Sequence, residues 1–241
     1  MGPMSPTLQV PTGPARLGLT AYGVLAVTNV TAIALGQDVA SSVTQWLLMP
    51  TLTVAFLALT RSGPRLDARL RAAVLAALGF SWLGDLLPHV VPDDAAFLTM
   101  IGCFLMAQIA YIVGFLPDRR RSILATSPPL TAAYAVVFVA LVAACAGGAG
   151  SLLGPVVVYG LTLTTMAVLA TGLGRLAGIG GALFMLSDSL IALGAFRDWS
   201  GRPLSMAIMA TYAVAQAMLV VGVATAASRR CSGPAAVGPA E

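Results

Sequence analysis

The feature that most constrains this chain is how few charges it carries. Only 9% of its 241 residues are charged, while 58% are hydrophobic. A soluble protein carries about 25% charged residues, so this chain cannot cover a water-facing surface. The composition therefore excludes an ordinary soluble enzyme, a disordered protein and a disulfide scaffold, and it predicts an integral membrane protein.

The apolar residues gather into runs, each long enough to cross a bilayer as a helix of about 20 residues. Eight such runs lie near residues 17–36, 43–60, 69–88, 95–116, 128–147, 151–173, 177–196 and 204–227. They are apolar on all sides, whereas the strands of a transmembrane barrel alternate apolar and polar residues over about ten positions. The sequence predicts an all-α bundle of eight transmembrane helices over residues 17–227. A short cytoplasmic segment, 1–16, precedes it and a disordered cytoplasmic tail, 228–241, follows it.

The arginines set the predicted orientation. All 13 basic residues are arginines, and eleven fall on one side of the predicted bundle: Arg16, Arg61, Arg65, Arg69, Arg71, Arg119, Arg120, Arg121, Arg175, Arg229 and Arg230. Arg197 and Arg202 fall on the other side. The richer side faces the cytoplasm by the positive-inside rule, so both termini are expected there. The absence of lysine beside abundant Ala and Gly suggests a bacterial chain, and therefore a multi-pass protein of the bacterial plasma membrane.

Two acidic residues fall inside the apolar runs. Asp85 lies near the outer end of the third run and Asp188 lies in the seventh. A charged Asp at the centre of a span costs about 2.5–3.5 kcal/mol, and such residues face the bundle interior and are functional by default. In untilted helices the two carboxyls differ in depth by about 9 Å, and tilt can bring them into one cavity. We expect both to be catalytic, with a structural hydrogen-bonding role as the alternative.

Other polar residues in the runs recur at helical spacing. Gln108 and Tyr111 are three residues apart, and Tyr212 and Gln216 are four apart, so each pair shares one helix face. Ser81 lies one turn before the first buried carboxylate. These residues are candidates for binding a substrate, and hydrogen bonding between helices is the alternative.

The sequence offers little for metal or serine chemistry. A catalytic zinc takes three protein ligands with histidine prominent, and the single histidine is His89, after Pro88 at the outer end of the third run. The three cysteines form no CxxC pair, and no GxSxG elbow is present. We expect no metal and no cofactor, with His89 as an interfacial residue. Nucleic acid is not an expected partner, since no basic stripe with interleaved aromatics exists. A second copy of the chain, in a homo-oligomer, is a further candidate partner.

The segments around the two aspartates carry a resemblance to a known family. The motifs are Gly181-Ala182-Leu183-Phe184 with Ser187-Asp188 and Ile191-Ala192, Gly84-Asp85, Pro155-Val156 with Tyr159, and Thr211-Tyr212 with Gln216. With these motifs the chain resembles the YhhN-like lysoplasmalogenase family over residues 17–227. Members have a similar length and about eight spans. The chain departs from them at Gln45-Trp46, where members often have Lys-Pro, and at Gln108, where they often have His.

The resemblance implies hydrolysis of the vinyl-ether bond of lysoplasmalogens, giving a fatty aldehyde and a glycerophospho-base. The partners are then a lysophospholipid substrate and membrane lipid. The family motifs add Tyr159 and Ser187 to the candidate substrate-binding residues. Arg197 and Arg202 are candidates for holding a phosphate headgroup, and ordinary interfacial anchoring is their alternative role.

The chemistry of a vinyl ether fits two carboxyl groups. Acid transfers a proton to carbon, an oxocarbenium ion forms and water adds; glycoside hydrolysis passes through a similar cation and uses two carboxyls. Burial favours the neutral form of a carboxyl, so one Asp can serve as general acid while the other, ionised, stabilises the cation or activates water. We expect Asp188, the deeper residue, to be the acid. A proton-coupled transporter that uses the two aspartates as a relay is the main alternative function.

Overall fold

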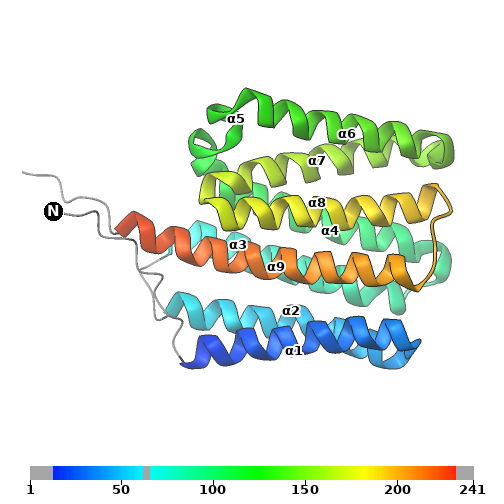
Figure 1. Cartoon of the computed structure of the whole chain (residues 1–241), viewed down its shortest axis with the longest axis horizontal. Helices are drawn as coiled ribbons and strands as arrows, with labels where there is room; N and C mark the ends of the chain where they lie inside the picture. Colours follow the sequence, from blue (N-terminus) through cyan, green and yellow to red (C-terminus); the bar gives the residue numbers. More distant parts are fainter. Residues whose placement is uncertain (1–12, 62–65, 232–241) are drawn as a thin grey trace, which may run out of the picture.

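The computed structural model describes residues 13–61 and 66–231, and helices make up nearly all of them (Figure 1). The long helices are α1 (Gly13–Leu35), α2 (Asp38–Arg61), α3 (Ala68–Leu86), α4 (Asp93–Phe115), α6 (Pro128–Ala149), α7 (Leu153–Ala170), α8 (Arg175–Phe196) and α9 (Arg202–Cys231). Short turns of helix connect some of them: η1 (Leu87–His89), η2 (Leu116–Arg121), α5 (Ile123–Thr126), η3 (Gly150–Leu152) and η4 (Thr171–Leu173). No strand occurs within these described ranges.

The prediction of an all-helical membrane protein is confirmed at this level. In the described part of the chain, seven helical segments are long and apolar enough to cross a membrane. One of them, Pro128–Leu173, has 46 residues and contains both α6 and α7. The long helices begin and end within a few residues of the predicted runs. Helix α9 continues to Cys231, past the expected start of the tail, and residues 1–12 and 232–241 lie outside the described residues.

The helices run back and forth along one common direction, so their connections gather at two ends (Figure 1). One end, called the basic end here, holds the start of α1, the end of α9 and the connections α2–α3, α4–α6 and α7–α8. The turns α1–α2, α3–α4, α6–α7 and α8–α9 form the opposite end. Arg16, Arg61, Arg69 and Arg175 belong to the basic end, as do the three arginines of η2.

Local signals explain where several helices begin and end. The side chain of Asp67 caps α3 by accepting hydrogen bonds from the backbone N–H groups of Arg69 and Leu70, which leaves fewer amide donors unpaired at the helix start. Pro128 occupies the first turn of α6, where its missing N–H costs nothing. Gly174, with φ of 116°, turns the chain from η4 into α8, in a region of φ that favours glycine.

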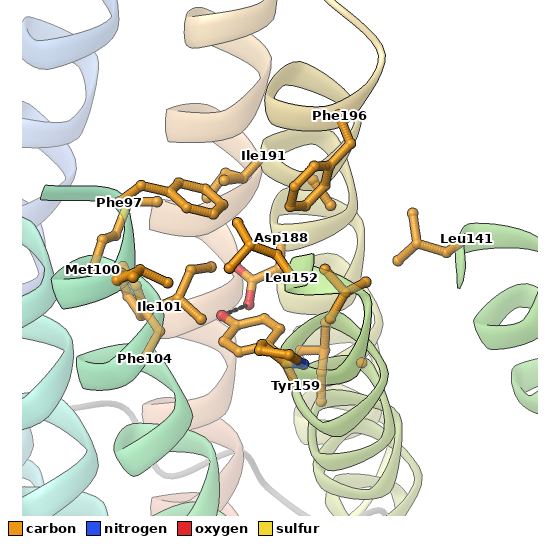
Figure 2. A pocket seen from close by; sticks show the side chains of 16 residues that line it. Phe97, Met100, Ile101, Phe104, Leu141, Leu152, Tyr159, Asp188, Ile191 and Phe196 are labelled. Atoms are coloured by element: carbon orange, nitrogen blue, oxygen red, sulfur yellow. Dashed lines mark hydrogen bonds between the residues drawn. The ribbon is translucent and has the colours of Figure 1, made fainter. Parts of the chain in front are cut away.

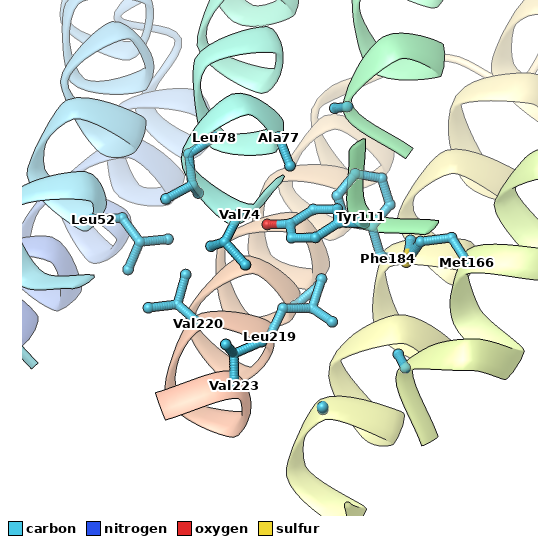
Figure 3. Close-up of a cluster of buried hydrophobic side chains, with 14 of the residues drawn as sticks. Leu52, Val74, Ala77, Leu78, Tyr111, Met166, Phe184, Leu219, Val220 and Val223 are labelled. Atoms are coloured by element: carbon cyan, nitrogen blue, oxygen red, sulfur yellow. The ribbon is translucent and has the colours of Figure 1, made fainter. Parts of the chain in front are cut away.

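The core lies toward the basic end and is built around α9. Leu219, Val220 and Val223 of α9 lie among buried side chains of α2, α3, α4, α7 and α8 (Figure 3). Close backbone approaches hold α8 against its neighbours: a Cβ at Gly180 would lie 2.9 Å from the backbone N of Leu219. Small residues permit such contacts between membrane helices, where packing drives association.

Three helices are buried only in their halves near the basic end. The buried residues of α7 begin at Gly160, those of α4 begin at Phe104, and those of α8 end at Asp188. Helix α3, in contrast, has buried residues along most of its length, from Leu70 to Asp85. The bundle is therefore closely packed at the basic end and opens between α4, α7 and α8 toward the opposite end.

Candidate functional site

A pocket occupies the space where α4, α7 and α8 separate. Its walls are almost entirely apolar, and Asp188 and Tyr159 supply polar groups to it (Figure 2). The other lining residues are Phe97, Leu98, Met100, Ile101, Phe104, Leu141, Leu152, Pro155, Val156, Gly160, Leu163, Ile191, Ala192 and Phe196. An apolar cavity with a few placed polar groups is the usual form of a small-molecule site.

Asp188 is held by two neutral hydrogen-bond donors that meet at the same oxygen. The Tyr159 hydroxyl donates to Oδ2 at 2.6 Å (Figure 2), and the Gln108 amide Nε2 donates to the same oxygen at 3.1 Å. Within the described residues no hydrogen bond reaches Oδ1. Asp188 thus keeps one oxygen available to a molecule in the pocket while the other is fixed from two helices.

Gln108 has an amide oxygen without a partner. The residue is fully buried, and its Oε1 makes no hydrogen bond within the described part of the chain, although Nε2 binds Asp188. A buried polar atom in this state costs about 1–3 kcal/mol, and such atoms call for a physical explanation. An acceptor beside a pocket carboxyl can be satisfied by a water or by a hydroxyl group of a ligand.

Asp85 is enclosed in a different part of the bundle. Gln45 of α2 donates to Oδ1 at 2.9 Å, and Tyr212 of α9 donates to Oδ2 at 2.9 Å. Only 2% of Asp85 is exposed, and it does not line the pocket. The two aspartates, which the sequence suggested could share one cavity, therefore do not both face this pocket.

Aromatic rings connect the two carboxyl groups. Phe104, Phe184 and Tyr212 contact one another edge to face, with ring centroids 5.7–6.3 Å apart. Tyr212 binds Asp85, and Phe104 lines the pocket of Asp188. The two sites are thus neighbours across one layer of packed rings.

The glycine before Asp85 makes room for this layer. A Cβ at Gly84 would lie 2.9 Å from Cε2 of the Phe104 ring, closer than carbon atoms pack. Glycine therefore lets Phe104 lie directly against α3. This contact gives the Gly84-Asp85 pair a packing reason in addition to the carboxyl itself.

A second polar chain lies beside Asp85. The Tyr111 hydroxyl donates to Oε1 of Gln216 at 2.7 Å, and Gln216 Nε2 donates to the Ser81 hydroxyl at 3.0 Å. All three residues are buried and none lines the pocket. In this structure Ser81, Tyr111 and Gln216 thus join α3, α4 and α9 by hydrogen bonds.

The residues of the α8 motif, Gly181 to Asp188, contact different parts of the protein. Gly181 packs closely against α7: a Cβ added at this position would lie 3.0 Å from Cα of Ala167. Ser187, a candidate for binding substrate, donates to the backbone oxygen of Ile208 at 3.0 Å and joins α8 to α9. Asp188, in contrast, lines the pocket. Neighbouring residues of a helix point about 100° apart, so Ser187 contacts α9 while Asp188 faces the pocket.

The two arginines of the opposite end point to different elements. Arg197 reaches the backbone oxygen of Ala144 in α6 at 3.5 Å, one turn from Leu141 of the pocket lining. Arg202 lies against Gly36 in the α1–α2 turn. Both are exposed. Arg197 is therefore at the rim of the pocket, and Arg202 is not brought to it.

His89 and Gln45 both make contacts between α2 and the segment formed by α3 and η1. His89 is exposed at the opposite end and contacts Trp46 edge to face at 5.4 Å, as suits an interfacial residue. Gln45 was not among the predicted site residues, although it binds Asp85. The signal that singled out Gln108, an amide inside an apolar run, applies equally to Gln45.

No three His, Cys, Asp or Glu side chains of the described ranges come together as a metal site would require.

Comparison with known proteins gives a match to the model of a protein family. No curated protein and no solved structure matches the chain. The model of the YhhN family matches residues 40–223, which include both aspartates and every helix that lines the pocket. The protein is therefore a multi-pass, helical membrane protein that belongs to the YhhN family.

Proposed function

We propose that this protein is a membrane hydrolase that cleaves the vinyl-ether bond of a lysoplasmalogen or a related lysolipid. The observation that carries the proposal is the position of Asp188, at a pocket that is otherwise almost wholly apolar. The alkenyl chain of such a lipid suits the pocket walls, and a vinyl ether needs an acid beside it. Membership in the YhhN family supports the same conclusion.

Asp188 acts as the general acid in this proposal. In apolar surroundings the neutral form of a carboxyl is favoured, and Oδ1 can hold the proton because Tyr159 and Gln108 both donate to Oδ2. The proton passes to the double-bond carbon that does not bear oxygen, and the other carbon becomes an oxocarbenium ion. General acid catalysis of this kind contributes about 10²–10⁴-fold to the rate.

Water completes the reaction. Its oxygen bonds to the oxocarbenium carbon, and its released proton returns to the Asp188 carboxylate. The bond between the hemiacetal carbon and the glycerol oxygen then breaks; the hemiacetal hydroxyl loses its proton, the glycerol oxygen gains one, and a fatty aldehyde and a glycerophospho-base leave. The unpaired Oε1 of Gln108 is the acceptor that holds this water, since it is on the amide group that already binds Asp188.

Asp85 supports the reaction without contacting the lipid. It accepts hydrogen bonds on both oxygens, and such bonds to a carboxylate favour its ionised form against the effect of burial. Its negative charge stabilises the positive charge that develops at the pocket, across the ring layer of Phe104, Phe184 and Tyr212. Asp85 is thus a positioning and electrostatic residue, while Asp188 is the catalytic one.

The proposal includes a membrane topology. Helices α6 and α7 each cross the bilayer, which makes eight spans, and the basic end faces the cytoplasm of a bacterial plasma membrane. The pocket then lies in the outer half of the membrane. Arg197, at the pocket rim, is placed to contact the phosphate of the lipid headgroup.

The test is an assay of the purified protein in detergent with a lysoplasmalogen, read by mass spectrometry of released aldehyde. Release by the wild-type protein and its loss in Asp188→Asn support the proposal. Asp93→Asn is the matched control, because Asp93 is exposed in the first turn of α4. A proton-coupled transporter yields no product in detergent, so intact lipid after incubation with a panel of lysolipids contradicts hydrolysis.

A further inference from the structure

The pocket is covered at the opposite end of the bundle. The rings of Phe97 in α4 and Phe196 in α8 both line it and contact each other edge to face, with centroids 5.8 Å apart. This pair stands between the pocket and the turns of the opposite end, where Arg197 follows Phe196 directly. Edge-to-face pairs of this kind are favourable contacts, so the pocket has an apolar roof on the side that the proposed topology exposes to water.

The flank of the pocket, in contrast, is open. Leu98 of α4 and Pro155 of α7 line it and are themselves exposed on the outside of the bundle, Leu98 by 51%. The first seven residues of α7 include none that is buried. Figure 2 shows the same space, with Phe97, Met100 and Ile101 of α4 on one side and α7 and α8 on the other.

The surface around this opening is apolar. Val157 and Val158 of α7 are exposed by 36% and 56%, and the outer half of α4 carries no charge after its first turn. On a helix of a membrane protein such a surface faces lipid chains. The pocket thus meets the hydrocarbon of the bilayer at its flank and an aromatic pair at its outer end.

We infer that a single-chain lipid reaches Asp188 sideways from the bilayer, through a portal between the outer halves of α4 and α7. The identity of the lipid rests on the proposed function. The route follows from the Phe97–Phe196 contact, which covers the outer end of the pocket, and from the exposed lining residues Leu98 and Pro155. A lipid chain that enters this way passes from hydrocarbon into apolar walls without crossing water. The headgroup stays near the interface, where Arg197 lies.

A photoreactive lipid tests the route without requiring hydrolysis. The probe is a lysophosphatidylcholine with a diazirine in its chain, added to Asp188→Asn protein in phosphatidylcholine vesicles. We expect labelled peptides from the pocket-lining parts of α4 and α7, and competition by unlabelled lysophosphatidylcholine. Even labelling of all exposed helices, or no protection by the single-chain competitor, overturns the inference.

Matched tryptophan variants locate the portal. Leu98→Trp and Val156→Trp fill lining positions and should lose most of the pocket labelling. Met106→Trp and Val158→Trp place the same ring on exposed positions of the same two helices outside the lining and should keep it. Gel filtration and thermal unfolding show whether each variant folds. Equal labelling in all four folded variants contradicts a portal at this place.

Opening the roof separates the two routes. Phe97→Ala is added to Leu98→Trp, so that the outer end is opened while the flank is blocked. Sideways entry predicts that labelling stays low, whereas entry from the outer end predicts that labelling returns and overturns the inference. Aldehyde release is measured separately: labelling without release contradicts the proposed hydrolysis alone, and release without pocket labelling contradicts the portal alone.

Discussion

The two buried aspartates have the same kinds of partner and different surroundings. Each receives one hydrogen bond from a glutamine amide and one from a tyrosine hydroxyl. At Asp188 both donors meet on one oxygen and the residue faces an open pocket, while at Asp85 each oxygen has its own donor and the residue is enclosed. Partner chemistry alone therefore does not decide which carboxyl meets a substrate; the arrangement of donors and the separation of the helices do.

The largest expected effect comes from Asp188→Asn. The amide cannot supply the proton, so turnover should fall by about 10²-fold or more, while the amide keeps an oxygen for Tyr159 and Gln108. Aldehyde release per folded protein measures this loss. Turnover within a factor of about two of wild type, a change of about 0.4 kcal/mol in the barrier, removes Asp188 from the chemistry.

Asp85→Asn should also lose most turnover, but by a smaller factor. Loss of a charge that acts across the ring layer is expected to lower kcat about tenfold, or about 1.4 kcal/mol in the barrier. KM should stay unchanged, because the residue does not line the pocket. A rise in KM with kcat intact contradicts this role and places Asp85 in contact with the lipid.

A matched pair of tyrosine variants sharpens the comparison further. Tyr159→Phe and Tyr212→Phe each remove one donor to a buried carboxyl, worth about 1 kcal/mol, or about fivefold in an equilibrium. For Tyr159 the loss should appear in kcat, since it frees the oxygen beside the reacting proton. For Tyr212 it should appear mainly as a lower unfolding temperature. A loss of kcat in Tyr212→Phe with only a lower unfolding temperature in Tyr159→Phe contradicts the roles assigned to Asp188 and Asp85.

The smallest effect is expected at the glycine between the sites. Gly84→Ala presses a methyl group against Phe104 and should cost about 1 kcal/mol of stability, at the low end for overpacking, because a ring edge can shift. Gly79→Ala is the control on the same helix, where nothing lies within 4 Å of the added Cβ. Thermal unfolding in detergent compares the two; equal unfolding temperatures contradict the tight ring contact.

Much of the fold could be predicted from the sequence because membrane helices must be long and apolar. Runs such as 128–147 and 177–196 fall within two or three residues of α6 and α8. Asp85 and Asp188 could be found because a carboxyl in an apolar run is costly. These inferences depend on composition along the chain, which needs no knowledge of how helices pack.

The division of roles within the site could not be predicted in this way. Ser187 and Asp188 are neighbours in the sequence, yet one joins α8 to α9 and the other lines the pocket. That difference depends on helix rotation and on where α4 and α7 separate from α8. Both are set by contacts between distant segments, such as Gly181 with Ala167. Gln45, in contrast, could have been found, because it is an amide inside an apolar run just as Gln108 is.

The most direct test of the central claim is hydrolysis in heavy water by purified protein. If Asp188 protonates a vinyl-ether carbon, the aldehyde released from a lysoplasmalogen carries one deuterium on the carbon next to its carbonyl, when trapped at once by reduction. Wild-type protein and the Asp93→Asn control should give this product, and Asp188→Asn should give almost none. Intact substrate with the wild-type protein, or undiminished deuterated aldehyde from Asp188→Asn, contradicts the account.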